Sequence, residues 1–255
     1  IAKSFMKLRS SKYVFAITAL LLILSQGNSA EQANTVKLRY LGHSAFLITT
    51  SSGTRIITDP AEFKGYRMPV GIEADIVTIS HEHMDHNNTS SIAPDFTSLR
   101  GCLPGNQKIN FIDTTLNGVH IYNVASYHDP GHHGLNSIFV LEIDNIRIAH
   151  LGDIGTELSA EQVVKIGCVD ILLIPVGGKF TIPRSVVESI VSQLCDGSII
   201  IPMHYQTEDF NSLPNSAEDF LRGKDNVIRT HQTEILISTN SFHEKNVYYK
   251  MEYKN

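Results

Sequence analysis

The chain has 255 residues, of which 42% are hydrophobic, and its formal net charge is −5 at neutral pH. This length and apolar content suffice for one domain with a sizeable core, and no apolar tract in the body of the chain is long enough to span a bilayer. The acidic balance argues against nucleic acid as a partner, because such binding depends on neutralising phosphates with Lys and Arg.

The N-terminal segment has the order of a secretory signal. Four basic residues precede an apolar run from Tyr13 to Leu24, and small and polar residues follow through Ala30. This pattern predicts a signal peptide over residues 1–30 and a mature domain over residues 31–255. A transmembrane anchor is the rival interpretation, but the apolar run is short for one. Cleavage would change the net charge from −5 to −9, because four positive charges and no negative ones are removed. We therefore expect a secreted or periplasmic protein with no stable membrane insertion after cleavage.

Three cysteines, Cys102, Cys168 and Cys195, allow at most one disulfide and one leftover thiol. Cys168 and Cys195 lie in apolar contexts, which predicts buried hydrophobic side chains rather than a bridge.

The first predicted elements are short strands. Residues 36–41 alternate in character, and residues 45–50 and 55–58 form a hairpin around a Gly-containing turn. His43 lies between the first two strands, and we expect it to orient other groups near a site rather than to bind a metal directly.

The densest chemistry follows a predicted buried strand at residues 74–80, which is apolar and β-branched. Four potential metal ligands then fall within six residues: His81, His83, Asp85 and His86. Residues two apart point the same way in an extended or tightly turned backbone, so His81 and His83 can close on one ion. Asp85 and His86 can face a second ion. The site would lie past the carboxyl end of a strand, where α/β folds place their sites. The alternative is a polar surface loop that is histidine-rich by chance.

More strands follow, and strands then alternate with helices. Strands are predicted at residues 108–113, 119–125, 137–143, 145–149, 169–175 and 198–201. Helices are predicted at residues 159–166, 183–194 and 215–223, the first and last opening with capping patterns. The last strands, at residues 234–237 and 246–253, are expected at sheet edges. This order predicts an α/β fold, a four-layer αββα sandwich in which two mixed sheets pack face to face.

Further polar residues follow the ends of later strands. His128 comes directly after one strand, and Asp153 follows another in a turn that Gly152 allows, although a cap is the alternative role for this Asp. His132 and His133 lie in a Gly-flanked loop and line a pocket or only its rim.

Two more side chains have open interpretations. His150 is expected to be structural or to support a ligand. Lys179 lies in the turn after Gly177 and Gly178 and either contacts an anionic substrate or is a solvated surface lysine.

The motif His-x-His-x-Asp-His after a strand resembles that of the metallo-β-lactamase fold hydrolases. More narrowly, the chain resembles the subgroup of ascorbate-6-phosphate lactonase-like metal-dependent hydrolases. Further matching segments are residues 41–48, 57–60, 150–153, 175–178 and 202–205. The resemblance extends from about residue 36 to the C-terminal end. It implies that His128 occupies the third histidine position and that Asp153 bridges two ions.

Seven candidates at four strand ends give each of two ions three ligands and one shared carboxylate. We expect His81, His83 and His128 on one ion, Asp85, His86 and His204 on the other, and Asp153 between them. Imidazole and carboxylate ligands suit Zn²⁺, with Mn²⁺ or Fe as alternatives. Asp85 and His204 are the expected catalytic residues.

Two ions ~3.5–4 Å apart can hold a shared hydroxide, because metal binding lowers the pKa of water towards roughly 7. We therefore expect a metal-dependent hydrolase that uses this hydroxide on a small ester, lactone or related small-molecule substrate. The alternatives are a phosphodiesterase or phospholipase-type hydrolase at the same metals, and a non-catalytic metal-binding protein. A serine hydrolase is disfavoured, because Ser44 and Ser126 lack a Gly-x-Ser-x-Gly elbow. The sequence leaves the oligomeric state open.

Overall fold

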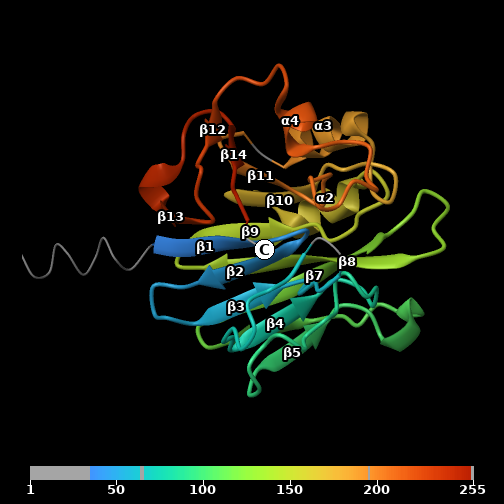
Figure 1. The fold of residues 1–255 in the computed structure, drawn as a ribbon, viewed down its shortest axis with the longest axis vertical. Coiled ribbons are helices and arrows are strands. Elements are labelled where there is room, and N and C mark those ends of the chain that lie inside the picture. The colour runs from blue at the N-terminus through green and yellow to red at the C-terminus, as the bar shows by residue number, and fades with distance from the viewer. Residues whose placement is uncertain (1–34, 64–65, 195, 254–255) are drawn as a thin grey trace, which may run out of the picture.

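The computed structural model describes residues 35–63, 66–194 and 196–253, which fold into two packed sheets and three helices (Figure 1). The predicted signal peptide at residues 1–30 lies outside this range. The first sheet has the strand order β13-β1-β2-β3-β4-β5. Its strands are β1 (Thr35–Gly42), β2 (Ala45–Thr49), β3 (Arg55–Thr58), β4 (Ile76–Ile79), β5 (Thr97–Arg100) and β13 (Glu234–Ser238). The pairs from β3 to β5 are parallel, and the others are antiparallel.

The second sheet has the order β12-β14-β11-β10-β9-β8-β7-β6. Its strands are β6 (Asp113–Leu116), β7 (Val119–Tyr127), β8 (Leu135–Ile143), β9 (Ile146–His150), β10 (Ile171–Pro175), β11 (Ile199–Met203), β12 (Val227–Arg229) and β14 (Val247–Lys250). Strands β6 to β9 pair antiparallel, and the pairs from β9 to β12 are parallel. Both sheets are therefore mixed.

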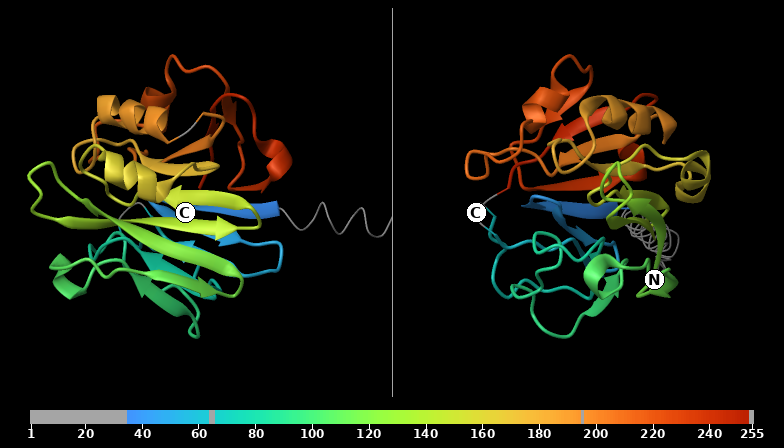
Figure 2. Two further views of the ribbon diagram at one scale, coloured as in Figure 1. Left: turned by 180° about the vertical axis from the view of Figure 1, so that it is seen from behind. Right: turned by 90° about the vertical axis from the view of Figure 1, so that its right-hand side faces the viewer.

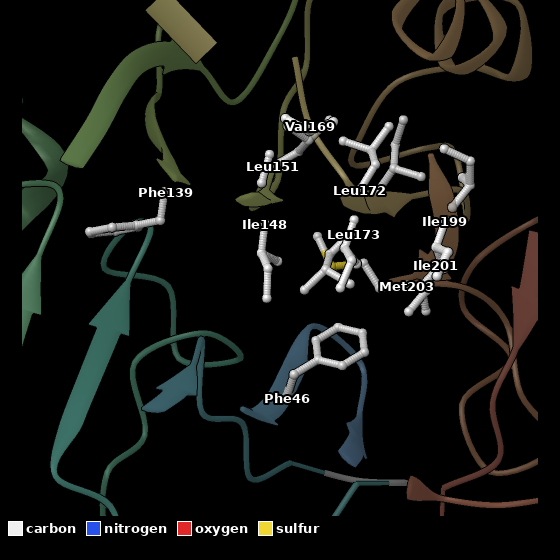
Figure 3. Close-up of a cluster of buried hydrophobic side chains, with 14 of the residues drawn as sticks. Phe46, Phe139, Ile148, Leu151, Val169, Leu172, Leu173, Ile199, Ile201 and Met203 are labelled. Carbon is white, nitrogen blue, oxygen red and sulfur yellow. The ribbon is translucent and has the colours of Figure 1, made fainter. Parts of the chain in front are cut away.

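The main core lies between the sheets and continues under the helices. Leu172 and Leu173 point to opposite faces of β10, and Phe46 of β2 lies across from Leu173 and Met203 (Figure 3). All five residues of β10 and of β11 are buried. This burial on both faces explains why these strands are continuous apolar runs rather than alternating ones.

Three helices cover the outer face of the second sheet (Figures 1 and 2). They are α2 (Ala160–Ile166), α3 (Arg184–Gln193) and α4 (Ala217–Leu221). Ser159 and Ser216 begin α2 and α4 with capping boxes, as the sequence predicts for α2. Within the described ranges, no helix is long and apolar enough to cross a membrane.

The outer face of the first sheet is covered differently. Met68, Ile72 and Ile92 from the connecting loops pack against outward-facing residues such as Ile57 and Val77. The layer on this side is built from loops and the short 3-10 turn η1 (Pro104–Asn106) in the described part of the chain. The predicted sandwich of two mixed sheets is confirmed, with one outer layer largely irregular.

Several predicted elements need correction. Residues 108–112 form no strand, and the strand begins at Asp113 instead. Strand β5 is not among the predicted strands, and its sequence, Thr-Ser-Leu-Arg, is polar; it forms because β4 offers a parallel edge. Strand β14 lies between β12 and β11 rather than at an edge.

The prediction for Cys168 is wrong. Cys168 is exposed and disulfide-bonded, although its sequence neighbours are apolar, because it lies at the turn between α2 and β10. Cys102 is a buried free thiol. Cys195 lies outside the described residues.

Candidate metal centre

The predicted ligands come together from four strand ends. His81 to His86 follow β4, His128 follows β7, Asp153 follows β9 and His204 follows β11. The carboxyl ends of parallel strands meet at one edge of a sheet, so loops that are distant in sequence place their side chains in one region.

Two of the resulting groups match the expected division between two ions. His81, His83 and His128 form one group, in which the ligand atoms all lie within 4.8 Å of one another. Asp85, His86 and His204 form another under the same limit, together with His43. The spacing is that of residues able to share a metal ion.

Asp153 lies between the two groups. Its Oδ2 is 3.1 Å from Nε2 of His86, 3.2 Å from Nε2 of His204 and 3.4 Å from Nε2 of His128. One carboxylate oxygen therefore approaches imidazoles of both groups, which is the position that a bridging ligand needs.

Several ligand atoms of the centre have no hydrogen-bond partner in the described part of the protein and are free to bind a cation. Among the described residues, the buried polar atoms without a hydrogen-bond partner include Nε2 of His81, Nε2 of His86, Nε2 of His128 and Oδ1 of Asp153. Leaving a buried polar atom unpaired is costly, and neutral imidazole and carboxylate are ligands that zinc accepts. These residues thus fit bound metal ions.

A buried carboxylate that the sequence reasoning missed orients two of these ligands. Asp59 Oδ2 accepts hydrogen bonds from Nδ1 of His86 (2.9 Å) and from the Ser80 hydroxyl (2.6 Å). The Ser80 oxygen in turn accepts from Nδ1 of His81 (2.9 Å). With Nδ1 protonated, both rings direct the Nε2 lone pair to the centre. The signal for Asp59 was its place directly after an apolar strand, which it shares with the ligands.

Burial and mutual charge set the protonation of the centre. Burial would raise the pKa of Asp153, but the neighbouring His204 and His86 lower it well below its usual range. Burial, followed by the charge of His86, lowers the pKa of His81 well below its usual value. The centre therefore favours an ionised Asp153 and a neutral His81, which are the forms that bind metals.

His43 lies beside the second ligand group, where the sequence predicts that it orients other groups. The side chain is fully buried, and its Nε2 lies 3.2 Å from Oδ2 of Asp85. Its backbone carbonyl accepts hydrogen bonds from the His204 N–H (2.8 Å) and the Tyr40 hydroxyl (3.0 Å). The turn between β1 and β2 thus supports one ligand by its side chain and another by its backbone.

Comparison with known proteins agrees with this centre. Residues 37–204, which contain all seven predicted ligands, match the family model of the beta-lactamase superfamily domain. A UPF0173 protein from Pyrococcus abyssi is 31% identical over 202 residues, covering 73% of this chain and 90% of that one. The chain belongs to this superfamily and to its UPF0173 family. A UPF0173 metal-dependent hydrolase from Thermococcus onnurineus is 29% identical, covering 68% of this chain and 85% of the relative.

Two solved structures have a similar fold. A Thermotoga maritima protein assigned to the metallo-beta-lactamase superfamily, and proposed to be a zinc-dependent hydrolase, is 30% identical with a TM-score of 0.68. The match covers 85% of this chain and 100% of that one. A metallo hydrolase from Ignicoccus hospitalis is 21% identical with a TM-score of 0.54 over 73% of this chain and 88% of that one, which shows the fold alone.

The other polar candidates of this UPF0173 chain lie outside the ligand groups. His132 stacks on Tyr127, with ring centroids 4.0 Å apart, and His133 is 88% exposed beside Asp129. His150 is buried and donates to the Ser44 carbonyl (2.8 Å), which is a structural contact. The amino group of Lys179 donates to the Ser212 carbonyl (3.4 Å), in the loop that follows His204.

Proposed function

We propose that this UPF0173 protein is a hydrolase that depends on two divalent metal ions, most simply Zn²⁺, and that it cleaves a small ester or lactone. The observation that carries the proposal is the place of Asp153 Oδ2, between Nε2 atoms of both histidine groups. A single carboxylate between two ligand sets is suited to bridging two adjacent ions, which in two-metal sites lie about 3.5–4 Å apart.

Under this proposal, His81, His83 and His128 would hold one ion, and Asp85, His86 and His204 would hold the other. Ions bound there would supply a nucleophile derived from water at neutral pH and would polarise the scissile carbonyl group. The protein's own contribution is orientation: Asp59 and Ser80 hold His81 and His86 in one tautomer.

Exposure indicates where the substrate would enter. His81, His86, Asp153 and His204 are buried, whereas His83 is exposed and the Asp85 side chain is 30% exposed. The open side of the centre is therefore formed by His83, Asp85 and the partly exposed His128. A substrate bound there would meet Asp85 directly, which supports a catalytic role for this residue, and the buried His204 would act from the same ligand group.

The resemblance of the sequence to lactonase-like proteins supports an ester or lactone as the substrate, whereas the same pair of metals could also cleave a phosphodiester. The test is hydrolysis of a lactone, a chromogenic ester, a β-lactam and bis-p-nitrophenyl phosphate by zinc-loaded protein and by chelated protein. We expect turnover of the lactone or ester that is lost on chelation. Turnover of the phosphodiester alone would replace the proposal with a phosphodiesterase, and turnover of none would favour a non-catalytic metal-binding protein.

Metal counting tests the two-ion assignment. We expect His204→Ala and His81→Ala to retain the fold and to bind about one ion each instead of two. Activity should fall by at least about 100-fold in both variants, since even residues that only support ligands cost 10- to 100-fold. His133→Ala, which changes an exposed histidine of the neighbouring loop, should keep both ions and the activity of the unmodified protein. Two ions in His204→Ala with unchanged turnover would refute the assignment.

A further inference from the structure

Two phenylalanines from separate loops meet beside the metal centre. Phe63 lies between β3 and β4, and Phe210 lies between β11 and α4. Their rings pack edge to face, with centroids 5.2 Å apart and an interplanar angle of 85°. Both are only partly buried, and neither belongs to the two hydrophobic clusters of the described residues. Packing of the core therefore does not explain their position.

The pair lies against His43, beside the second ligand group. Phe63 packs edge-on against His43 with centroids 4.8 Å apart, and Phe210 lies 6.1 Å from the same ring. His43 in turn contacts Asp85 and lies 4.1 Å, centroid to centroid, from His204. The phenylalanines thus adjoin the second ligand group.

The first ligand group has a different surrounding. The ring contacts of His81, His83 and His128 within the described residues are with one another and with His86. The two phenyl rings therefore lie on one side of the centre only. A substrate lying across both ions would have one end beside polar groups and the other beside the rings of Phe63 and Phe210.

Both loops are held in place. The backbones of Phe63 and Tyr66 exchange two hydrogen bonds (3.1 and 2.8 Å), and Asn88 N–H donates to the Pro60 carbonyl (2.9 Å). The buried Tyr66 packs behind both phenylalanines, with centroids 5.1 and 5.9 Å away. In the second loop, the Phe210 N–H donates to the Thr207 hydroxyl (3.1 Å). These contacts fix the two rings in advance, which lowers the entropic cost of binding against them.

We propose that Phe63 and Phe210 form a subsite for an apolar acyl or aryl group of the substrate, on the Asp85–His204 side of the centre. This inference rests on the proposed function and narrows its substrate class to esters or lactones that carry an alkyl chain or a ring next to the scissile bond. Ligand sites typically combine a few placed polar groups with an aromatic lining of this kind.

A second role for the pair would be simply to shield His43 from water. The two roles differ in what the rings recognise. A shield affects every ligand of the metal centre equally, whereas a subsite affects only those ligands that have an apolar group to place against the rings.

The test is the affinity of zinc-loaded protein for phenylphosphonate and for methylphosphonate, measured by calorimetry. The two probes have the same metal-binding head and differ in the apolar group. We expect phenylphosphonate to bind about tenfold more tightly, because its ring is removed from water. In Phe63→Ala and in Phe210→Ala this preference should fall to about twofold or less. Phe111→Ala, which removes a phenyl ring that is 74% exposed in the loop before β6, should keep it.

Equal affinities in the unmodified protein, or an equal loss for both probes in the two variants, would overturn the subsite. Failure of phenylphosphonate to bind would also overturn it. Thermal unfolding of each variant checks that the fold persists. Binding needs no turnover, so the two proposals can fail separately. A phenyl preference without ester or lactone hydrolysis would refute the proposed function and leave the subsite standing. Hydrolysis without a phenyl preference would refute the subsite and leave the proposed function standing.

Discussion

Three donors converge on the carboxylate of Asp59: the Ser80 N–H, the Ser80 hydroxyl and Nδ1 of His86. The residue binds no ion in the assignment above, yet it sets the direction in which His86 presents its free nitrogen. Burial would raise the pKa of Asp59, but His150 and His86 lower it, so the carboxylate stays ionised as an acceptor. Orientation of ligands by buried carboxylates is common at metal sites.

Asp59→Asn should therefore weaken metal binding without removing a ligand. The three donors are shared between both carboxylate oxygens of Asp59. Asparagine has only one acceptor oxygen on its side chain, so at least one donor loses its partner. We expect about 10- to 100-fold weaker binding of the more weakly held ion, measured by competition with a chelating dye. Asp95→Asn, in an exposed loop, is the matched control and should leave the affinity unchanged. Unchanged affinity in Asp59→Asn would show that His86 needs no such support.

At the scale of elements, the turn after β9 shows how closely the two sheets approach at the centre. Gly152 has a positive φ of 55°, and a Cβ atom there would lie 2.3 Å from Oδ1 of Asn136 and 2.7 Å from Cβ of Ser80. Asn136 Oδ1 accepts the Asp153 N–H at 3.0 Å. The glycine thus lets Asp153 reach its position between the two ligand groups.

Gly152→Ala should destabilise the fold more than a positive φ alone can explain. Gly71 has a φ of 73° with nothing near its missing Cβ, so Gly71→Ala isolates the backbone strain. We expect Gly152→Ala to lower the free energy of unfolding by a further ~1–3 kcal/mol relative to that control, because it adds steric overlap. Denaturant unfolding of the two variants measures the difference. Equal losses would mean that the turn can relax.

A charge cluster links strands of the second sheet. His120 of β7 contacts Glu142 of β8 through Nδ1 (2.9 Å) and Asp113 of β6 through Nε2 (2.8 Å). Arg147 also contacts Glu142. The hydrogen bonds to Glu142 and Asp113 raise the pKa of His120 above its usual value of 6.5.

A raised pKa in the folded state means that this cluster stabilises the fold at acid pH. The contribution is fully present below pH 6.5 and is lost as the pH rises through the higher pKa of the folded state. We expect His120→Gln to cost about 0.5 kcal/mol at pH 5.5 and less at pH 8.5, the small size reflecting solvent screening. Unfolding at both pH values tests it. A larger cost at the alkaline pH would contradict this sign.

For the molecule as a whole, the disulfide at Cys168 bears on where the protein works. Disulfides persist in oxidising compartments such as the periplasm and the exterior of the cell. Together with the basic, apolar and small-residue order of residues 3–30, it supports our proposal that the protein is exported.

Export predicts a new N-terminus. Protein recovered from expressing cells should begin between Asn28 and Glu31, because the small residues before this point suit a signal peptidase. N-terminal sequencing of the recovered protein decides it. A soluble cytoplasmic protein that retains the apolar run from Tyr13 would contradict the prediction.

The sequence by itself determined the fold class and the candidate ligands. Apolar runs at residues 169–175 and 198–201 predicted buried strands, which the structure confirms at residues 171–175 and 199–203. The spacing of His81, His83, Asp85 and His86 is likewise local information. A residue that lies at a strand end and carries a ligand side chain can be recognised without knowing its neighbours in space.

Tertiary structure alone decided the contacts between such ends. Asp59 orients His86 only because loops from different strands pack together. The meeting of Phe63 and Phe210 beside His43 depends on loop packing in the same way. Such packing leaves no periodic pattern in the sequence. Strand β5 likewise forms because β4 offers it an edge, and not because its own residues favour a strand. Local spacing records local geometry, whereas contacts across 20 or more residues depend on the assembled fold.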